Sequence, residues 1–186
     1  LIYGESGCGK STFARILSGY ENYQEGEIWI NHTLLPNVDS ARLRHHVTYV
    51  GQEDGLLFMS LRENILLGRN VSSEVFEQVC HICRVDEIVK AHPMGYDMLI
   101  EEDAANLSSG QKQRVILARS ILTISDVYCF DESFCHLDVS LEREILKDLF
   151  SYFSNQMVIV ISHRFGNEDL YDQKICFSKG GLLCKS

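Results

Sequence analysis

The chain has 186 residues, of which 45% are hydrophobic, and it carries a formal net charge of −9 at pH 7. This length and apolar content allow one compound domain with a sizeable core. The 17 basic residues are dispersed along the chain, which argues against a nucleic-acid partner, because neutralising phosphates needs clustered Lys and Arg. The longest apolar run, 157–161, is far below the roughly 20 residues that a membrane span needs. The 7 cysteines lack the regular spacing of a disulfide framework and predict free thiols.

The first chemically informative segment follows the apolar run Leu1-Ile2-Tyr3 and reads Gly4-Glu5-Ser6-Gly7-Cys8-Gly9-Lys10-Ser11-Thr12. A strand that turns through glycines into a helix directs several backbone N–H groups at one concave spot, which suits phosphate oxygens. Lys10 is placed to reach the β- and γ-phosphates, and the Ser11 hydroxyl is placed to ligate Mg²⁺. Apolar residues at 13, 16 and 17 predict a helix over 12–17 that ends before Gly19. The segment predicts a nucleoside triphosphate site.

The next stretches read as strand, strand and helices. Residues 27–31 alternate like a half-buried strand, and a second strand over 47–50 ends beside Gln52. The Gln52 amide could ligate Mg²⁺ or orient an attacking water through its carbonyl oxygen; a polar loop residue is an equally good interpretation from spacing alone. Residues 60–92 are mostly helical by their apolar spacing. They predict a helical insertion between sheet strands.

A helix start follows, and it admits two interpretations. Ser108 with Gln111 three residues later forms the Ser-x-x-Gln pattern of a capping box, which is common and carries no function. A helix N-terminus that bears Ser108, Ser109 and Gly110 is also a place where an anion can bind.

Two later strands deliver polar groups to one sheet edge. The apolar run 127–130 ends in Asp131 and Glu132, and 157–162 ends in His163. The carboxyl ends of parallel strands are where ligands bind in open α/β sheets. Asp131 could hold magnesium through water, Glu132 could polarise a water, and His163 could bond the γ-phosphate and Glu132. Solvated acids are the alternative for Asp131 and Glu132, and the upstream phosphate loop argues against it. For His163 the alternative is a structural role, which is the more common one for a lone histidine at a strand end.

Taken together, these residues resemble the nucleotide-binding domain of ATP-binding cassette transporters over almost the whole chain. GESGCGKST resembles the Walker A loop, Gln52 the Q-loop, LSSGQ the signature motif, VYCFDE the Walker B strand with its glutamate, and ISHR the switch histidine. A phosphate loop alone would fit many ATPases and GTPases. The signature motif 20 residues before Asp131 (counted from Gln111) and His163 32 residues after it are nearly diagnostic of this family.

The resemblance implies an α/β P-loop NTPase core of the RecA type with a mostly parallel sheet, a partial antiparallel β subdomain and an inserted helical signature subdomain. We expect the catalytic core over 1–59 and 123–186 and the helical subdomain over 60–122. A strand that feeds a phosphate loop usually has sequence before it, so we expect the natural chain to continue upstream. In an exporter, that upstream sequence would be the membrane domain.

The resemblance also implies ATP hydrolysis with Mg²⁺ in a head-to-tail dimer with two sites. One copy would supply the Walker A residues, Gln52, Asp131, Glu132 and His163, with Lys10 and Gln52 assisting the catalytic pair; the other would supply Ser108, Ser109, Gly110 and Gln111 in trans. Ser11, Gln52 and Asp131, the last through water, would hold the metal. Closure on ATP would drive a membrane domain through alternating access, with this domain at the cytoplasmic face of the plasma membrane.

Within the family, residues 49–58 and 61–65 resemble exporters, and the closest similarity is to bacterial peptide or bacteriocin exporters. There are also departures: Ser109 replaces a common glycine, Asp103-Ala104 stands where a glycine is usual, and 135–138 differ from the family's Ser-Ala-Leu-Asp loop. Two alternatives remain open. One is a soluble ABC-type ATPase of DNA repair or translation, and the other is a non-hydrolysing regulatory nucleotide-binding module.

Overall fold

The structure is a computed structural model that describes residues 1–30, 32–35, 38–51, 54–178 and 181–185. Its helices are α1 Lys10–Leu17, α2 Ser40–His46, α3 Leu61–Leu66, α4 Ser73–Ile82, α5 Val85–Lys90, α6 Ser109–Ile121 and α7 Val139–Tyr152. Its strands are β1 Ile2–Gly4, β2 Trp29–Ile30, β3 Thr33–Leu34, β4 Val47–Val50, β5 Val127–Asp131, β6 Met157–Ile161, β7 Ile175–Ser178 and β8 Gly181–Lys185. Short 3-10 turns are η2 Gly95–Asp97, η3 Glu102–Ala104 and η4 Glu168–Leu170.

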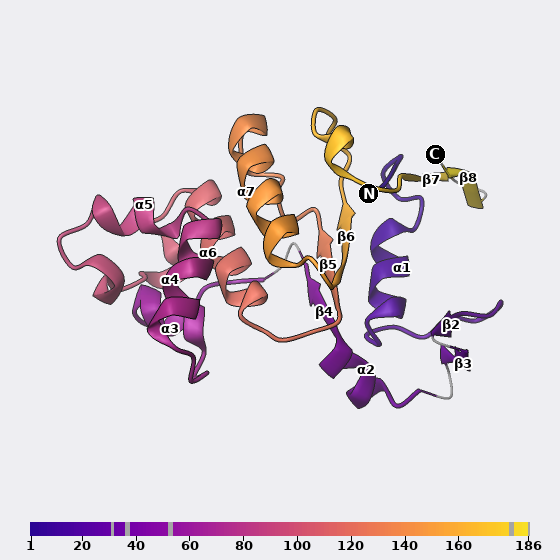
Figure 1. Ribbon diagram of the computed structural model, residues 1–186, viewed down its shortest axis with the longest axis horizontal. Coiled ribbons are helices and arrows are strands. Elements are labelled where there is room, and N and C mark those ends of the chain that lie inside the picture. Colours follow the sequence, from indigo (N-terminus) through magenta and orange to yellow (C-terminus); the bar gives the residue numbers. More distant parts are fainter. Residues whose placement is uncertain (31, 36–37, 52–53, 179–180, 186) are drawn as a thin grey trace. The chain divides into compact units, whose positions relative to one another are not determined.

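The described chain forms two compact units, drawn in Figure 1. Unit 1 combines Leu1–Val50, Ile124–Glu132 and Asn155–Ser186, and unit 2 combines Gly51–Thr123 and Ser133–Ser154. Unit 2 therefore takes in α7 as well as the helices of the expected subdomain at 60–122. The expected bounds of the catalytic core, 1–59 and 123–186, and of the helical subdomain, 60–122, stay a prediction.

Unit 1 is built on a sheet with strand order β4-β5-β6-β1-β7-β8. Neighbouring strands from β4 through β5, β6 and β1 to β7 pair in parallel, and β8 pairs antiparallel with β7. Because the parallel strands end at the same edge, the segments after β1, β5 and β6 meet there. This topology confirms the predicted α/β class with a mostly parallel sheet.

Helix α1 packs on this sheet through a small apolar cluster. Ala14 is fully buried and lies with Ile2, Cys129 and Ile161, one residue from each of β1, β5 and β6. Phe13 packs against the same cluster. The helix that follows the phosphate loop is thus fixed to the strands that carry the other predicted site residues.

The strand predicted over 27–31 is shorter in the structure. Strand β2 covers Trp29–Ile30 and pairs antiparallel with β3, and residue 31 lies outside the described residues. The backbone N–H of Leu35 donates to the carbonyl of Ile28 at 2.8 Å, which extends the pairing by one bond. A two-stranded ribbon this short is the antiparallel β element that the fold class anticipates.

Unit 2 is helical, and its helices bury regular apolar stripes. In α4, Phe76, Val79 and Cys80 follow i, i+3, i+4 spacing and are 4%, 0% and 0% exposed. Helices α3, α4 and α5 each contact α6, and α4 contacts α7. The described part of the chain contains no helix that combines the length and the apolar character of a membrane span. The helix with the signature motif is therefore the central helix of this unit.

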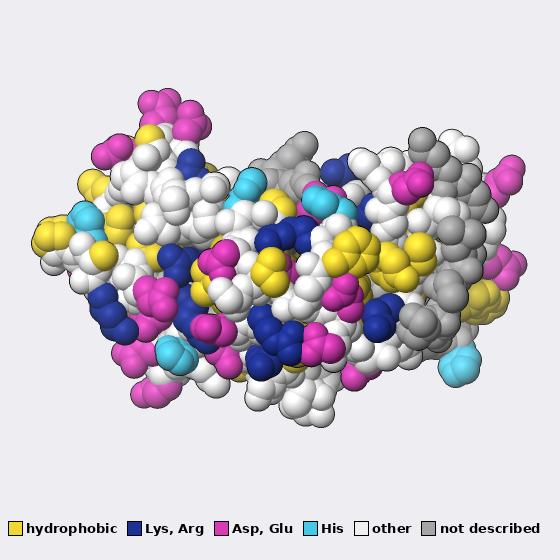
Figure 2. Space-filling view, turned by 90° about the horizontal axis from the view of Figure 1, so that it is seen from above, with side chains coloured by type: hydrophobic (Ala, Val, Ile, Leu, Met, Phe, Trp, Pro, Cys, Tyr) yellow, Lys and Arg dark blue, Asp and Glu magenta, His cyan; other side chains and the backbone are white. Residues whose placement is uncertain are grey.

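One face of the molecule carries charges of both signs (Figure 2). On the face drawn in Figure 2, Lys and Arg side chains lie among Asp and Glu side chains. The 6 cysteines whose side chains are described are all free thiols.

Candidate functional site

The phosphate loop runs from the end of β1 to the start of α1, and its glycines are required by the backbone. Gly4 has φ 148°, and a Cβ there would lie 2.1 Å from the carbonyl oxygen of Phe177 on the neighbouring strand β7. Gly9 is the N-cap of α1 with φ 98°, in the left-handed region. Larger residues at either position would clash or be strained.

Lys10 is folded back against this loop. Its Nζ donates to the carbonyl oxygens of Gly4 and Glu5 at 3.0 and 2.8 Å, and the residue is only 6% exposed. Helix α1 begins without a side-chain cap. The loop therefore combines a fixed cation with N–H groups at a helix start, an arrangement that attracts phosphate.

The remaining loop residues differ in accessibility. Cys8 and Ser11 are half-buried. Four residues of the loop are exposed: Glu5, Ser6, Gly7 and Thr12.

Asp131 and Ser11 come together although they are 120 residues apart. The Ser11 hydroxyl donates to Asp131 Oδ1 at 3.1 Å, and Asp131 is 3% exposed at the end of β5. A hydroxyl and a carboxylate are the hard oxygen donors that Mg²⁺ prefers. These residues fit the predicted metal.

Sequence reasoning missed Tyr49 as a residue of this site. Its hydroxyl donates to Asp131 Oδ2 at 2.8 Å and accepts from Arg15 Nε at 3.4 Å. Burial, together with the bond to Asp131, raises the pKa of Tyr49 to about 12 despite the opposing effect of Arg15, so the hydroxyl keeps its proton at physiological pH. The sequence offered one signal for it: Tyr49 lies in the strand predicted over 47–50, which ends beside the predicted metal ligand Gln52.

Glu132 and His163 also lie together at this edge. His163 Nδ1 is 3.2 Å from Glu132 Oε1. Glu132 has φ 53°, a left-handed backbone that is uncommon for a non-glycine residue, and its N–H donates to the carbonyl of Ile161 at 3.0 Å. A residue held in such a conformation at the end of a buried strand is typical of functional sites. Gln52 lies outside the described residues, and its predicted roles stay predictions.

In unit 2, the signature segment starts helix α6 with the predicted capping box. The N–H of Gln111 donates to Ser108 Oγ at 3.2 Å, and the N–H of Ser108 donates to Gln111 Oε1 at 2.9 Å. This local prediction is confirmed. Ser108 and Ser109 are exposed, and a Cβ on Gly110 would lie 3.1 Å from the carbonyl oxygen of His136. The glycine therefore allows the loop after β5 to approach this helix start.

The departure at Asp103-Ala104 has a structural counterpart. Both residues have φ 53°, in the region that glycine adopts most easily. Lys112 on α6 donates to the carbonyl of Asp103 at 2.6 Å. The Lys112 side chain thus stabilises the left-handed backbone at Asp103, where the family usually has a glycine.

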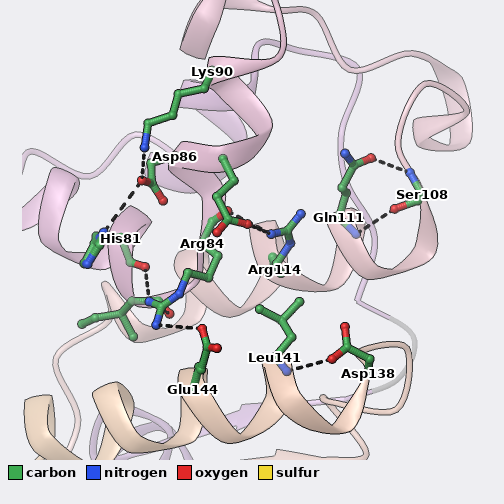
Figure 3. A network of polar contacts seen from close by, with 12 residues as sticks. His81, Arg84, Asp86, Lys90, Ser108, Gln111, Arg114, Asp138, Leu141 and Glu144 are labelled. Carbon is green, nitrogen blue, oxygen red and sulfur yellow. Dashed lines mark hydrogen bonds and ion pairs between the residues drawn. The ribbon is translucent and has the colours of Figure 1, made fainter.

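A polar network fixes α6 to its neighbours, as Figure 3 shows. Arg114 on α6 donates to the carbonyl of Arg84 at 3.1 Å and to Glu87 at 2.8 Å. Arg84 pairs in turn with Asp148 at 2.8 Å and Glu144 at 3.6 Å, both on α7. These side chains link α5, α6 and α7, so the helix that begins with the signature segment is held to both of its neighbours by polar contacts.

Known proteins are similar to this chain along its length. The family model described as ABC transporter matches residues 1–135. A pediocin PA-1 transport/processing ATP-binding protein of Pediococcus acidilactici is 33% identical over 186 residues, covering 98% of this chain and 26% of that protein. A lactococcin-G-processing and transport ATP-binding protein of Lactococcus lactis is 34% identical over 185 residues, covering 98% and 26%.

A solved structure agrees with these relatives. The structure of a bacterial ABC exporter with ATP bound has a TM-score of 0.91 and 31% identity, covering 100% of this chain and 32% of its own. The chain thus spans about a quarter to a third of the length of these three proteins. From its matched residues and its fold, the chain belongs to the ABC transporter family, as an ATP-binding ATPase domain.

Proposed function

We propose that this chain binds ATP with Mg²⁺, hydrolyses it in a head-to-tail pair of domains, and powers export of a peptide across the plasma membrane from its cytoplasmic face. The observation that carries the proposal lies in unit 1. The Ser11–Asp131 pair at 3.1 Å and the Glu132–His163 pair at 3.2 Å share one sheet edge with the phosphate loop. These contacts support the proposal because the groups assigned to the metal and to the proton lie at the same sheet edge as the loop assigned to the phosphates.

The residues divide the work as follows in this proposal. Lys10 and the N–H groups of the loop bind the β- and γ-phosphates. Ser11, Asp131 and Gln52 would hold Mg²⁺, Asp131 through water, and the ion would supply positive charge beside the phosphates. Glu132 accepts the proton of the attacking water, and His163 keeps Glu132 in place at 3.2 Å. Most of the rate comes from positioning and from charge placed around the γ-phosphate.

The second half of the site comes from another copy in this proposal. Ser108, Ser109, Gly110 and Gln111 form the start of α6, where two exposed serines and the helix N-terminus suit the γ-phosphate of a partner's nucleotide. The capping box holds this segment in shape without occupying Ser109.

The peptide substrate is proposed from the relatives. Proteins named for transport and processing of pediocin PA-1 and lactococcin-G match 98% of this chain at 33% and 34% identity. The transmembrane domain of the same transporter is the proposed partner, because the chain spans only 26% of those proteins.

The catalytic assignment is tested with Glu132→Gln. This variant keeps ATP binding, loses turnover by roughly a thousandfold, and accumulates an ATP-bound dimer, because only the proton acceptor is removed. Steady-state phosphate release and size-exclusion chromatography with ATP measure these outcomes. Glu25→Gln makes the same change at an exposed acid and leaves turnover unaltered. Normal hydrolysis in Glu132→Gln would sink the assignment.

The phosphate loop is tested with Lys10→Ala, which removes the buried ammonium and weakens ATP binding at least about a hundredfold. Lys147→Ala, an exposed lysine of α7, is the matched control. Fluorescent-nucleotide titration measures both, and unchanged affinity in Lys10→Ala contradicts the loop assignment.

Export is tested by ATP-dependent uptake of a labelled peptide into inside-out membrane vesicles that contain the protein with its membrane domain. Glu132→Gln abolishes this uptake. Hydrolysis without any transport would favour the soluble ABC-type ATPase, and nucleotide binding without hydrolysis would favour the regulatory module.

A further inference from the structure

Tyr49 lies beside the predicted metal site but has no place in the proposed reaction. It is on β4, in register with Cys129 of β5, and is half-buried. Its hydroxyl reaches across to Asp131 Oδ2 at 2.8 Å. The hydroxyl thus contacts the carboxylate oxygen opposite the one that Ser11 contacts.

The direction of these hydrogen bonds is fixed by the chemistry of Arg15. A guanidinium has donors only, so Arg15 Nε, 3.4 Å away, can only donate to the Tyr49 oxygen. The tyrosine proton is therefore free to point to Asp131, where it meets a carboxylate oxygen at a distance ordinary for an O–H···O hydrogen bond. Arg15 is itself held by Glu21 at 3.3 Å.

This arrangement restricts rotation of the Asp131 carboxylate. The terminal torsion of an aspartate is broad and two-fold, so a buried carboxylate without partners could turn. Tyr49 holds Oδ2 at 2.8 Å while Ser11 approaches Oδ1 at 3.1 Å, and the two hydroxyls come from different elements, β4 and α1. The carboxylate therefore keeps Oδ1 turned toward Ser11.

We propose that Tyr49 is a positioning residue of the metal site, whose hydroxyl orients Asp131 so that the ATP-bound protein binds a divalent cation more tightly. This inference rests on the proposed function, because it assigns Asp131 to the metal. Outer-shell partners of metal ligands change metal affinity by about 10–100-fold in other proteins. Asp131 would meet the ion through water, so we expect the tyrosine that orients it to act at the lower end of this range.

The test measures cation binding without turnover. In the Glu132→Gln background, Mn²⁺ is titrated at saturating ATP and free Mn²⁺ is followed by electron paramagnetic resonance. Tyr49→Phe keeps the ring and removes the hydroxyl, and it weakens Mn²⁺ binding about tenfold. Tyr20→Phe is the control: its ring lies 5.7 Å from that of Tyr49, and Tyr20 is 59% exposed. It leaves Mn²⁺ binding unchanged.

Two further measurements separate positioning from loss of structure. With Glu132 intact, Tyr49→Phe raises the Mg²⁺ concentration for half-maximal hydrolysis about tenfold, while kcat at saturating Mg²⁺ stays within about twofold. Arg15→Met, at a partly exposed side chain, removes the ion pair with Glu21 and, of the bonds to Tyr49, only the long 3.4 Å one. Tyr49 stays in place, and we expect Mn²⁺ binding to weaken by about threefold. This variant tests the inference even if Tyr49→Phe is unstable.

The outcomes are distinct. If the Glu132→Gln reference shows no ATP-dependent Mn²⁺ binding, the proposed function fails, and the inference with it. If the reference binds Mn²⁺ and Tyr49→Phe binds it equally well, the inference alone is overturned. A lower kcat at saturating Mg²⁺ with unchanged metal affinity would also overturn it.

Discussion

Asn64 is the residue whose replacement tests the packing of unit 2 most directly. It is fully buried in α3, and its side-chain amide both accepts and donates hydrogen bonds with the irregular segment before the helix. Oδ1 accepts from the N–H of Leu57 at 2.8 Å, and Nδ2 donates to the carbonyls of Leu57, Met59 and Ser60 at 2.9, 3.3 and 3.1 Å. Arg119 on α6 donates to Oδ1 at 3.0 Å. The amide therefore joins α3, α6 and residues 57–60.

Asn64→Ala removes all of these side-chain bonds. Each hydrogen bond contributes about 1 kcal/mol net, and each buried group left without a partner costs about 1–3 kcal/mol. Arg119 keeps its bonds to the carbonyls of Asn64 and Gly55, both at 2.8 Å, and Leu57 is 49% exposed, so water replaces part of the loss. We expect unfolding free energy to fall by about 3 kcal/mol.

Asn64→Asp provides a finer comparison. It keeps an acceptor for Leu57 and Arg119 but loses the donor to three backbone carbonyls. A carboxylate facing carbonyl oxygens is repelled, and the charge on Arg119 offsets part of that repulsion. We therefore expect the free energy of unfolding of Asn64→Asp to lie between that of the original protein and that of Asn64→Ala.

Urea unfolding followed by circular dichroism measures the free energy, and hydrogen exchange at residues 55–60 locates the change. Asn22→Ala, at an exposed asparagine of unit 1, is the control and should alter neither. A loss below about 1 kcal/mol for Asn64→Ala, with unchanged exchange at Leu57, would refute the reasoning.

Three further predictions follow from local geometry. Gly4→Ala should abolish nucleotide binding in fluorescent titrations, because its Cβ would lie 2.1 Å from the Phe177 carbonyl oxygen; normal binding would contradict this. Burial raises the pKa of the Cys80 and Cys129 thiols to about 11 and about 12, so at pH 8 both stay protonated and should react with maleimide only after unfolding, as peptide mass spectrometry would show. Ser60→Ala should lower the free energy of unfolding by about 1 kcal/mol in urea titrations, since it removes the α3 capping box; an unchanged midpoint would argue against that cap.

The sequence determined the features that depend on neighbouring residues. A glycine-rich loop between strand and helix is set by backbone angles, and the positive φ of Gly7 and Gly9 agrees with that prediction. The Ser108–Gln111 capping box is likewise a contact over three residues, and it forms as expected. Such patterns are readable because the chain itself brings the groups together.

Other contacts between distant residues had no counterpart in the sequence analysis and were decided by the tertiary structure. Tyr49 reaches Asp131 across 82 positions only because β4 is placed next to β5, and Arg119 reaches Asn64 across 55 positions because α6 packs on α3. The spacing of apolar residues predicts individual strands and helices but leaves the order of the strands and the partners of each helix open. That order follows from packing the whole core, and so the contacts of Tyr49 with Asp131 and of Arg119 with Asn64 became known only from the fold.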